Sequence, residues 1–98
     1  MQFKTVIGEV NLIAKRKAHI NQTHPIMETY IKNLKDVLEQ PDDIRYSNYN
    51  LNVLLFYRYF DNIENGKYIA VVVNKIKKQV ITAYLTSRIK TGEKYEKE

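Results

Sequence analysis

The chain has 98 residues, a formal net charge of +5 and no cysteine. Its length predicts a single domain over residues 1–98, with a frayed tail at residues 93–98. The lack of cysteine excludes a disulfide scaffold, thiolate zinc sites and a cysteine nucleophile. No apolar run approaches the roughly 18 residues of a membrane span, and the chain begins without a signal-peptide stretch. We therefore expect a cytoplasmic protein with no membrane partner.

The first quarter of the chain predicts an extended segment followed by a short helix. Residues 2–12 alternate loosely between apolar and polar side chains around Gly8, which indicates a short strand or a two-part extended arm. Residues 13–22 are good helix formers. Lys15 and His19 are four residues apart there and would share one face of the helix.

A second helix is predicted after His24. Pro25 suits the first position of a helix, because the N–H that it lacks has no partner there. The residue before a proline is disfavoured in helical geometry, so we expect His24 at the break between the two helices. Apolar residues at a spacing of about 3.6 predict one continuous helix over residues 25–40, which Pro41 ends.

The second half of the chain predicts strands at residues 43–48, 52–60, 67–74 and 79–86. Asn65–Gly66 indicates a hairpin turn between the second and the third of them. Short connections between these segments predict an antiparallel meander of three or four strands, with the N-terminal helices on one face. The predicted fold class is therefore α+β.

Any site on the sheet depends on which way the strand residues point. In the last strand we expect Thr82 and Tyr84 to point away from the helices, because alternate residues lie on opposite faces of a sheet. The residues expected on its core face are Ile81, Ala83 and Leu85. Both faces of the strand over residues 52–60 are apolar, so its buried face stays open.

The two histidines do not form a metal motif. His19 and His24 are five residues apart across the expected helix break, whereas helical ligand pairs are usually spaced by three or four. No carboxylate lies between them, and no third strong ligand is near in sequence, so we predict neither a metal site nor a cofactor. The isolated glycines and serines match no phosphate loop or nucleophile elbow.

Acid–base chemistry without a metal is the remaining option. Cleavage of RNA by its own 2′-hydroxyl requires a base, an acid and cations for the phosphate. Histidine can fill either proton role, and arginine can hold a phosphate. The candidate catalytic residues are His19, Arg58, Thr82 and Tyr84, and the candidate substrate-binding residues are Lys15, Arg16 and Arg45. They would form a site only if they converge.

Each candidate also has a purely structural explanation. His19 can be an ordinary helix residue, and the strand threonine and tyrosine suit a sheet anywhere. His24 can cap the second helix. Arg58 can pair with Asp61 or Asp43. The basic charge can attract a polyanion, and the eight tyrosines can stack on bases, but neither feature establishes a nucleic-acid partner.

Several short motifs appear in a fixed order: HI–x3–HP, PDDIR, LLFYR, KYIAVVV and ITAY. Over about residues 10–93 this order resembles the phage and mobile-element branch of the barnase–EndoU–colicin–RelE-like nucleases. The resemblance implies N-terminal helices against an antiparallel sheet. It also implies a metal-independent ribonuclease, such as a toxin or a phage-type processing enzyme, or a domain derived from one.

By the same resemblance, His19 would transfer protons and Arg58 would bind the phosphate. Thr82 and Tyr84 would orient the substrate or stabilise charge. RNA is the expected partner, together with an inhibitor or antitoxin protein if the domain is a toxin.

Two other functions stay open. One is a non-catalytic module that binds nucleic acid or protein through the same basic, tyrosine-rich surface. The other is an interaction protein that self-associates through an exposed strand edge. Salt-dependent binding without a product would favour the first, and a concentration-dependent mass would favour the second.

Overall fold

The structure is a computed structural model that describes residues 1–90 and 92–96, and it confirms the α+β class. In chain order its elements are β1 (Gln2–Thr5), β2 (Gly8–Asn11), α1 (Ala14–Thr23), α2 (Met27–Tyr30), the 3-10 helix η1 (Ile31–Asn33), α3 (Leu34–Glu39), β3 (Asp43–Tyr46), β4 (Val53–Phe60), β5 (Lys67–Asn74) and β6 (Gln79–Thr86). Among the described residues, no helix is long and apolar enough to cross a membrane.

Over the described residues the sheet has six strands in the order β1-β2-β6-β5-β4-β3, so the expected count of three or four is wrong. The meander from β3 to β6 is antiparallel as predicted. The extra strands come from the extended arm, which folds into the β1–β2 hairpin and joins β6 through a parallel pairing at Asn11 and Gln79. Local pattern could not reveal this pairing, because the two strands are far apart in the sequence.

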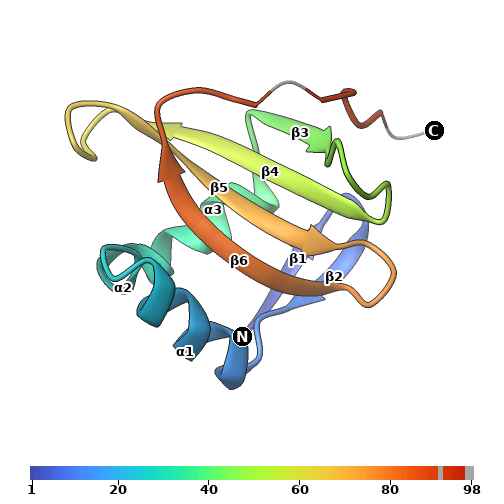
Figure 1. The fold of residues 1–98 in the computed structure, drawn as a ribbon, viewed down its shortest axis with the longest axis horizontal. Coiled ribbons are helices and arrows are strands. Elements are labelled where there is room, and N and C mark those ends of the chain that lie inside the picture. The colour runs from blue at the N-terminus through green and yellow to red at the C-terminus, as the bar shows by residue number, and fades with distance from the viewer. Residues whose placement is uncertain (91, 97–98) are drawn as a thin grey trace.

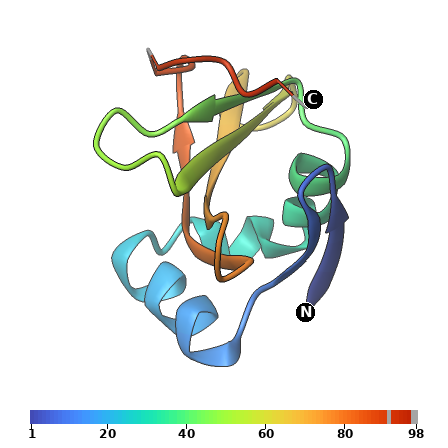
Figure 2. The same ribbon diagram turned by 90° about the vertical axis from the view of Figure 1, so that its right-hand side faces the viewer.

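The sheet curls around the helices (Figures 1 and 2). Helix α3 packs against β1, β4 and β5, and α1 packs against β6. The side chains between these layers form one apolar cluster whose fully buried members include Val10, Leu34, Leu38, Phe56 and Val71. The opposite face of β3 to β6 is turned away from α3, and we call it the outer face.

The predicted helix over residues 25–40 is not continuous. It divides into α2, η1 and α3, although its apolar stripe still faces the core, as the burial of Met27 and Val37 shows. Side chains three residues apart align in a 3-10 helix, and Ile31 and Leu34 are both buried across this segment. The 3.6-residue pattern therefore identified the buried side but not the change of helical geometry.

A β-bulge in β6 changes which residues face the core. Val72 pairs with Thr82, but Val73 pairs with Val80, so Ile81 is an extra residue without a partner across the strand. Val80 is consequently buried with Ala83, whereas Ile81 is only partly buried. The prediction is confirmed for Ala83 and for Leu85, which packs on the core, and it is wrong for Ile81.

The described part of the tail is paired rather than frayed. The Glu93 carbonyl accepts a hydrogen bond from Tyr46 N at 2.8 Å, and Tyr95 N donates to the Ile44 carbonyl at 2.9 Å. Residues 93–96 thus lie along the free edge of β3, where backbone groups would otherwise lack sheet partners. Residues 97–98 of the expected tail lie outside the described residues.

Candidate functional site on the outer face

Strand register places tyrosines together on the outer face. Tyr57 pairs with Ala70, which pairs with Tyr84, and directly paired residues share a face of the sheet. The next row on this face contains Tyr59 and Tyr68, whose rings lie 5.2 Å apart between centroids. Strand β4 therefore buries side chains on both faces, because Tyr57 is as fully buried as the core residues.

Tyr57 and Tyr84 lie on the same face on either side of the small side chain of Ala70, which is fully buried. The phenol of Tyr84 adds to the effect of burial in raising the pKa of Tyr57, although a whole strand separates the two backbones. The Tyr57 hydroxyl also accepts the backbone N–H of Lys90 at 3.3 Å. Burial raises the pKa of Tyr57 above its usual value of about 10, so this phenol stays neutral at physiological pH.

Tyr84 has a positively charged neighbour and an imidazole neighbour. The Lys90 ammonium lies 5.4 Å from the centroid of the Tyr84 ring, within the range of a cation–π interaction. The centroid of the His24 ring lies 5.8 Å from that of the Tyr84 ring, and the two ring planes are tilted by 36°. The ring of Tyr84 thus has both an imidazole and an ammonium group as neighbours.

His24 occupies the predicted break between helices, but its side chain does not cap α2. Its backbone N–H donates to the Ile20 carbonyl at 2.8 Å, and its own carbonyl accepts from Met27 N at 2.9 Å. The side chain is partly buried and is four residues after the buried Ile20, so both point toward β6 from one side of α1. The sequence pointed to a cap because the contact with Tyr84 exists only in the tertiary structure.

Arg58 lies on the wrong face for the predicted site. It pairs with Ile69, which is buried in the core, so Arg58 projects to the helix side of the sheet. There its guanidinium donates to the carbonyl of Gln40 at the end of α3. The expected convergence of Arg58 with Thr82 and Tyr84 is therefore wrong.

The other candidates divide between the outer face and helix α1. Thr82 is partly buried on the outer face of β6. The pairing of the strands across β5 and β4 places it in line with Arg45 on β3, three strands away. His19 is exposed on α1, and so are its neighbours Lys15 and Arg16. No ring contact or ion pair joins these three helix residues to the outer face among the contacts described for residues 1–90 and 92–96.

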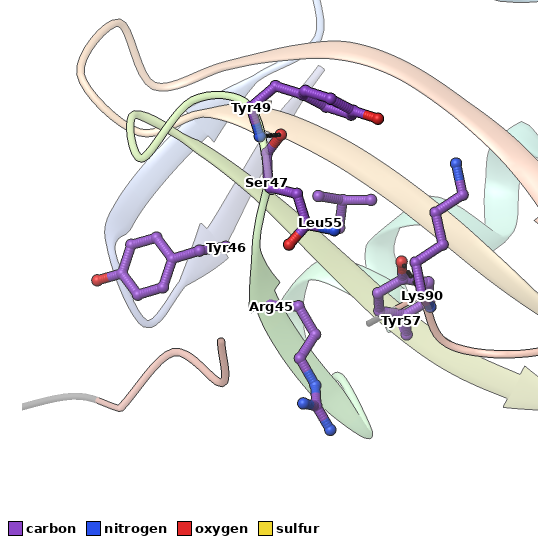
Figure 3. Close-up of a pocket in the computed structure, with 8 residues that line it drawn as sticks. Arg45, Tyr46, Ser47, Tyr49, Leu55, Tyr57 and Lys90 are labelled. Carbon is purple, nitrogen blue, oxygen red and sulfur yellow. Dashed lines mark hydrogen bonds between the residues drawn. The ribbon is translucent and has the colours of Figure 1, made fainter. Parts of the chain in front are cut away.

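A pocket of about 100 Å³ opens between the β3–β4 loop and the segment after β6 (Figure 3). Within the part of the chain that the structure describes, its lining includes two cationic side chains, Arg45 and Lys90, and no carboxylate. Asp43 nevertheless offsets part of the Arg45 charge through an ion pair at 2.9 Å, and Arg45 Nη1 donates to the Gly92 carbonyl at 3.0 Å. Of the two cations, Arg45 is therefore the one whose charge is partly neutralised by a described carboxylate.

The group around Tyr84 contains His24, which the sequence predicted only as a helix break or cap, and two residues that were not candidates, Tyr57 and Lys90. The repeated tyrosines were a real signal, but assigning them to one face required the register of three strands. Among the described residues, no three histidine, aspartate or glutamate side chains are grouped to hold a metal ion. Comparisons of the chain with family models, curated proteins and solved structures gave no match.

Proposed function

We propose that the protein is a metal-independent ribonuclease whose site lies on the outer face around Tyr84. The observation that carries the proposal is that the Tyr84 ring has two neighbours: His24, at 5.8 Å between ring centroids, and the Lys90 ammonium, at 5.4 Å from the Tyr84 centroid. This group supplies a proton acceptor, a proton donor and a cation, which are the parts that cleavage by the 2′-hydroxyl requires. Arg45 adds a second cation beside the neighbouring pocket.

The hydrogen bonds suggest how the protons would move. Tyr57 accepts from Lys90 N and keeps its own proton, which it would direct toward the Tyr84 oxygen in this mechanism. The Tyr84 proton is then available to a ligand. The imidazole of His24 would take the proton of the 2′-hydroxyl as its oxygen bonds to phosphorus. Tyr84 would protonate the 5′-oxygen as the bond between phosphorus and that oxygen breaks, and the product would be a 2′,3′-cyclic phosphate.

The test is cleavage of a defined single-stranded RNA by the purified protein in EDTA. The expected products are a 2′,3′-cyclic phosphate end and a free 5′-hydroxyl end, identified by mass spectrometry. Tyr84→Phe removes the proposed acid and keeps the ring, so it should slow cleavage by about 100-fold. Absence of cleavage by the wild-type protein, or equal rates in Tyr84→Phe, would refute the proposal.

A non-catalytic nucleic-acid module is the second candidate, and one observation favours it. Arg58, the arginine expected to hold the phosphate, points to the helix side of the sheet. The outer face could then bind RNA without cleaving it. Binding that weakens with salt and yields no product would identify this function.

The family resemblance in the sequence supports the same substrate class. It suggests a toxin or a phage-type processing nuclease that works in the cytoplasm. For a toxin, the partner would be an inhibitor or antitoxin protein. Growth arrest on expression of the wild type, and its absence with Tyr84→Phe, would test this biological role.

A further inference from the structure

Tyr49 stands out because its side chain is 98% exposed, more than that of any other large hydrophobic residue described. It lies in the loop between β3 and β4, and this loop is hydrogen-bonded internally. Tyr49 N donates to the Ser47 hydroxyl at 3.2 Å, and Ser47 N donates to the Val53 carbonyl at 2.9 Å. Asn50 accepts two more hydrogen bonds: its side-chain oxygen from Asn52 N at 2.8 Å, and its carbonyl from Val53 N at 3.0 Å. The backbone therefore presents the aromatic ring to solvent from a structured loop.

A groove of about 480 Å³ lies directly beside this ring. Arg88, Ile89 and Lys90 form one wall, and Asn48 and Tyr49 form the other. The groove shares Asn48, Tyr49 and Lys90 with the smaller pocket that Tyr57 lines, so the two are neighbours. In Figure 3 the Tyr49 ring and the Lys90 ammonium lie on the same upper side of the pocket.

The charge of the groove suits an anion. Among the described residues, its lining contains the cations Arg88 and Lys90 and no carboxylate. Arg88 is held close to the end of β6, because the Thr86 hydroxyl donates to the Arg88 carbonyl at 3.0 Å. An exposed aromatic ring next to two cations is the combination that single-stranded nucleic acids use, with a base stacked on the ring and a phosphate near the charges.

We propose that Tyr49 is a stacking platform for one nucleobase of a single-stranded RNA, and that Arg88 and Lys90 hold an adjoining phosphate. This inference rests on the proposed function for the identity of the ligand, and it adds a second binding position that shares only Lys90 with the group around Tyr84. A base inside a duplex is already stacked on both sides, so the platform selects unpaired RNA. Every base has a π-face, so the platform is tolerant of sequence.

The test is fluorescence anisotropy with a labelled single-stranded RNA of eight nucleotides that carries 2′-O-methyl groups, which prevent cleavage. Tyr49→Ala should weaken binding by roughly tenfold, whereas Tyr49→Phe keeps the ring and should bind like the wild type. Leu51→Ala is the matched control, because Leu51 is 67% exposed in the same loop and has no ring. A duplex of the same length should show no dependence on Tyr49.

The outcomes separate this inference from the proposed function. Unchanged affinity in Tyr49→Ala, or equal losses in Tyr49→Ala and Leu51→Ala, overturns the platform even if the wild type cleaves unmodified RNA. Binding that depends on Tyr49, with no cleavage of unmodified RNA, supports the platform and overturns the nuclease. Absence of binding to the eight-nucleotide RNA by the wild type overturns the platform.

Discussion

The ring of His24, at the end of α1, lies 5.8 Å from the ring of Tyr84 in the middle of β6. This relationship joins the helical half of the chain to the outer face of the sheet. It also gives the two histidines different expected roles, because His19 is exposed on α1 and has no described contact with the outer face.

The first prediction compares the two histidines. His24→Ala should reduce kcat/KM for RNA cleavage by roughly 100-fold or more, because it removes the proposed general base. His19→Ala should leave the rate within about twofold and is the matched control. Loss of cleavage in His19→Ala with normal cleavage in His24→Ala would assign the chemistry to the exposed helix face instead.

Tyr57→Phe tests the buried phenol. The change leaves the Lys90 N–H without its acceptor and should lower the free energy of unfolding by about 1 kcal/mol at pH 7, measured with urea. The pKa of Tyr57 is raised in the folded state, so its extra stabilisation is present below pH of about 10 and is lost as the pH rises through the raised value. The advantage of the wild type over Tyr57→Phe should therefore shrink above pH 10. A difference that is constant from pH 8 to 11 would contradict this assignment.

Lys90→Gln and Arg58→Gln should differ in their effect on RNA binding. Lys90 lines the pocket, so its loss should reduce the slope of log affinity against log salt by about 0.7, as expected for one phosphate contact on a single strand. Arg58 donates to the Gln40 carbonyl on the opposite face, so Arg58→Gln should leave that slope unchanged and lower only stability. A smaller slope in Arg58→Gln would place its side chain near the RNA.

Ala70→Leu should separate the two phenols. Ala70 is fully buried and lies between Tyr57 and Tyr84 in the register, so a larger side chain there would crowd both rings. We expect a loss of about 1–3 kcal/mol of stability from overpacking. We also expect a fall in cleavage beyond that of Val72→Leu, a control in the same strand. Equal cleavage in the two variants would show that the contact between the phenols is not required.

The bulge in β6 can be tested by paired truncations. Val80 is buried and Ile81 is only partly buried, so Val80→Ala should cost on the order of 2 kcal/mol and Ile81→Ala about half as much or less. Chemical denaturation of both variants measures the difference. The reverse order would indicate that β6 follows the regular alternation of the sequence pattern.

Local sequence pattern was sufficient for most of the secondary structure. The predicted bounds 67–74 and 79–86 match β5 and β6, and the helix over residues 13–22 matches α1 within one residue at each end. These elements follow from backbone preferences and from spacing that neighbouring residues carry themselves. The broken helix at η1 and the unpaired Ile81 escaped the pattern, because each depends on how the curved sheet and the helices fit together.

The residue types of the candidate site were visible in the chain, but their grouping was not. Side chains one residue apart in a strand lie on opposite faces, so a single step in register decides whether an arginine meets a ligand or the core. Because Tyr57 and Arg58 are adjacent in β4, Arg58 lies on the helix side of the sheet and Tyr57 lies on the same face as Tyr84. The contact of His24 with Tyr84 depends on the packing of α1 against β6, and no spacing along the chain encodes a distance between a helix and a strand. Composition and periodicity therefore determined the elements and the available chemistry, and tertiary packing decided which groups can act together.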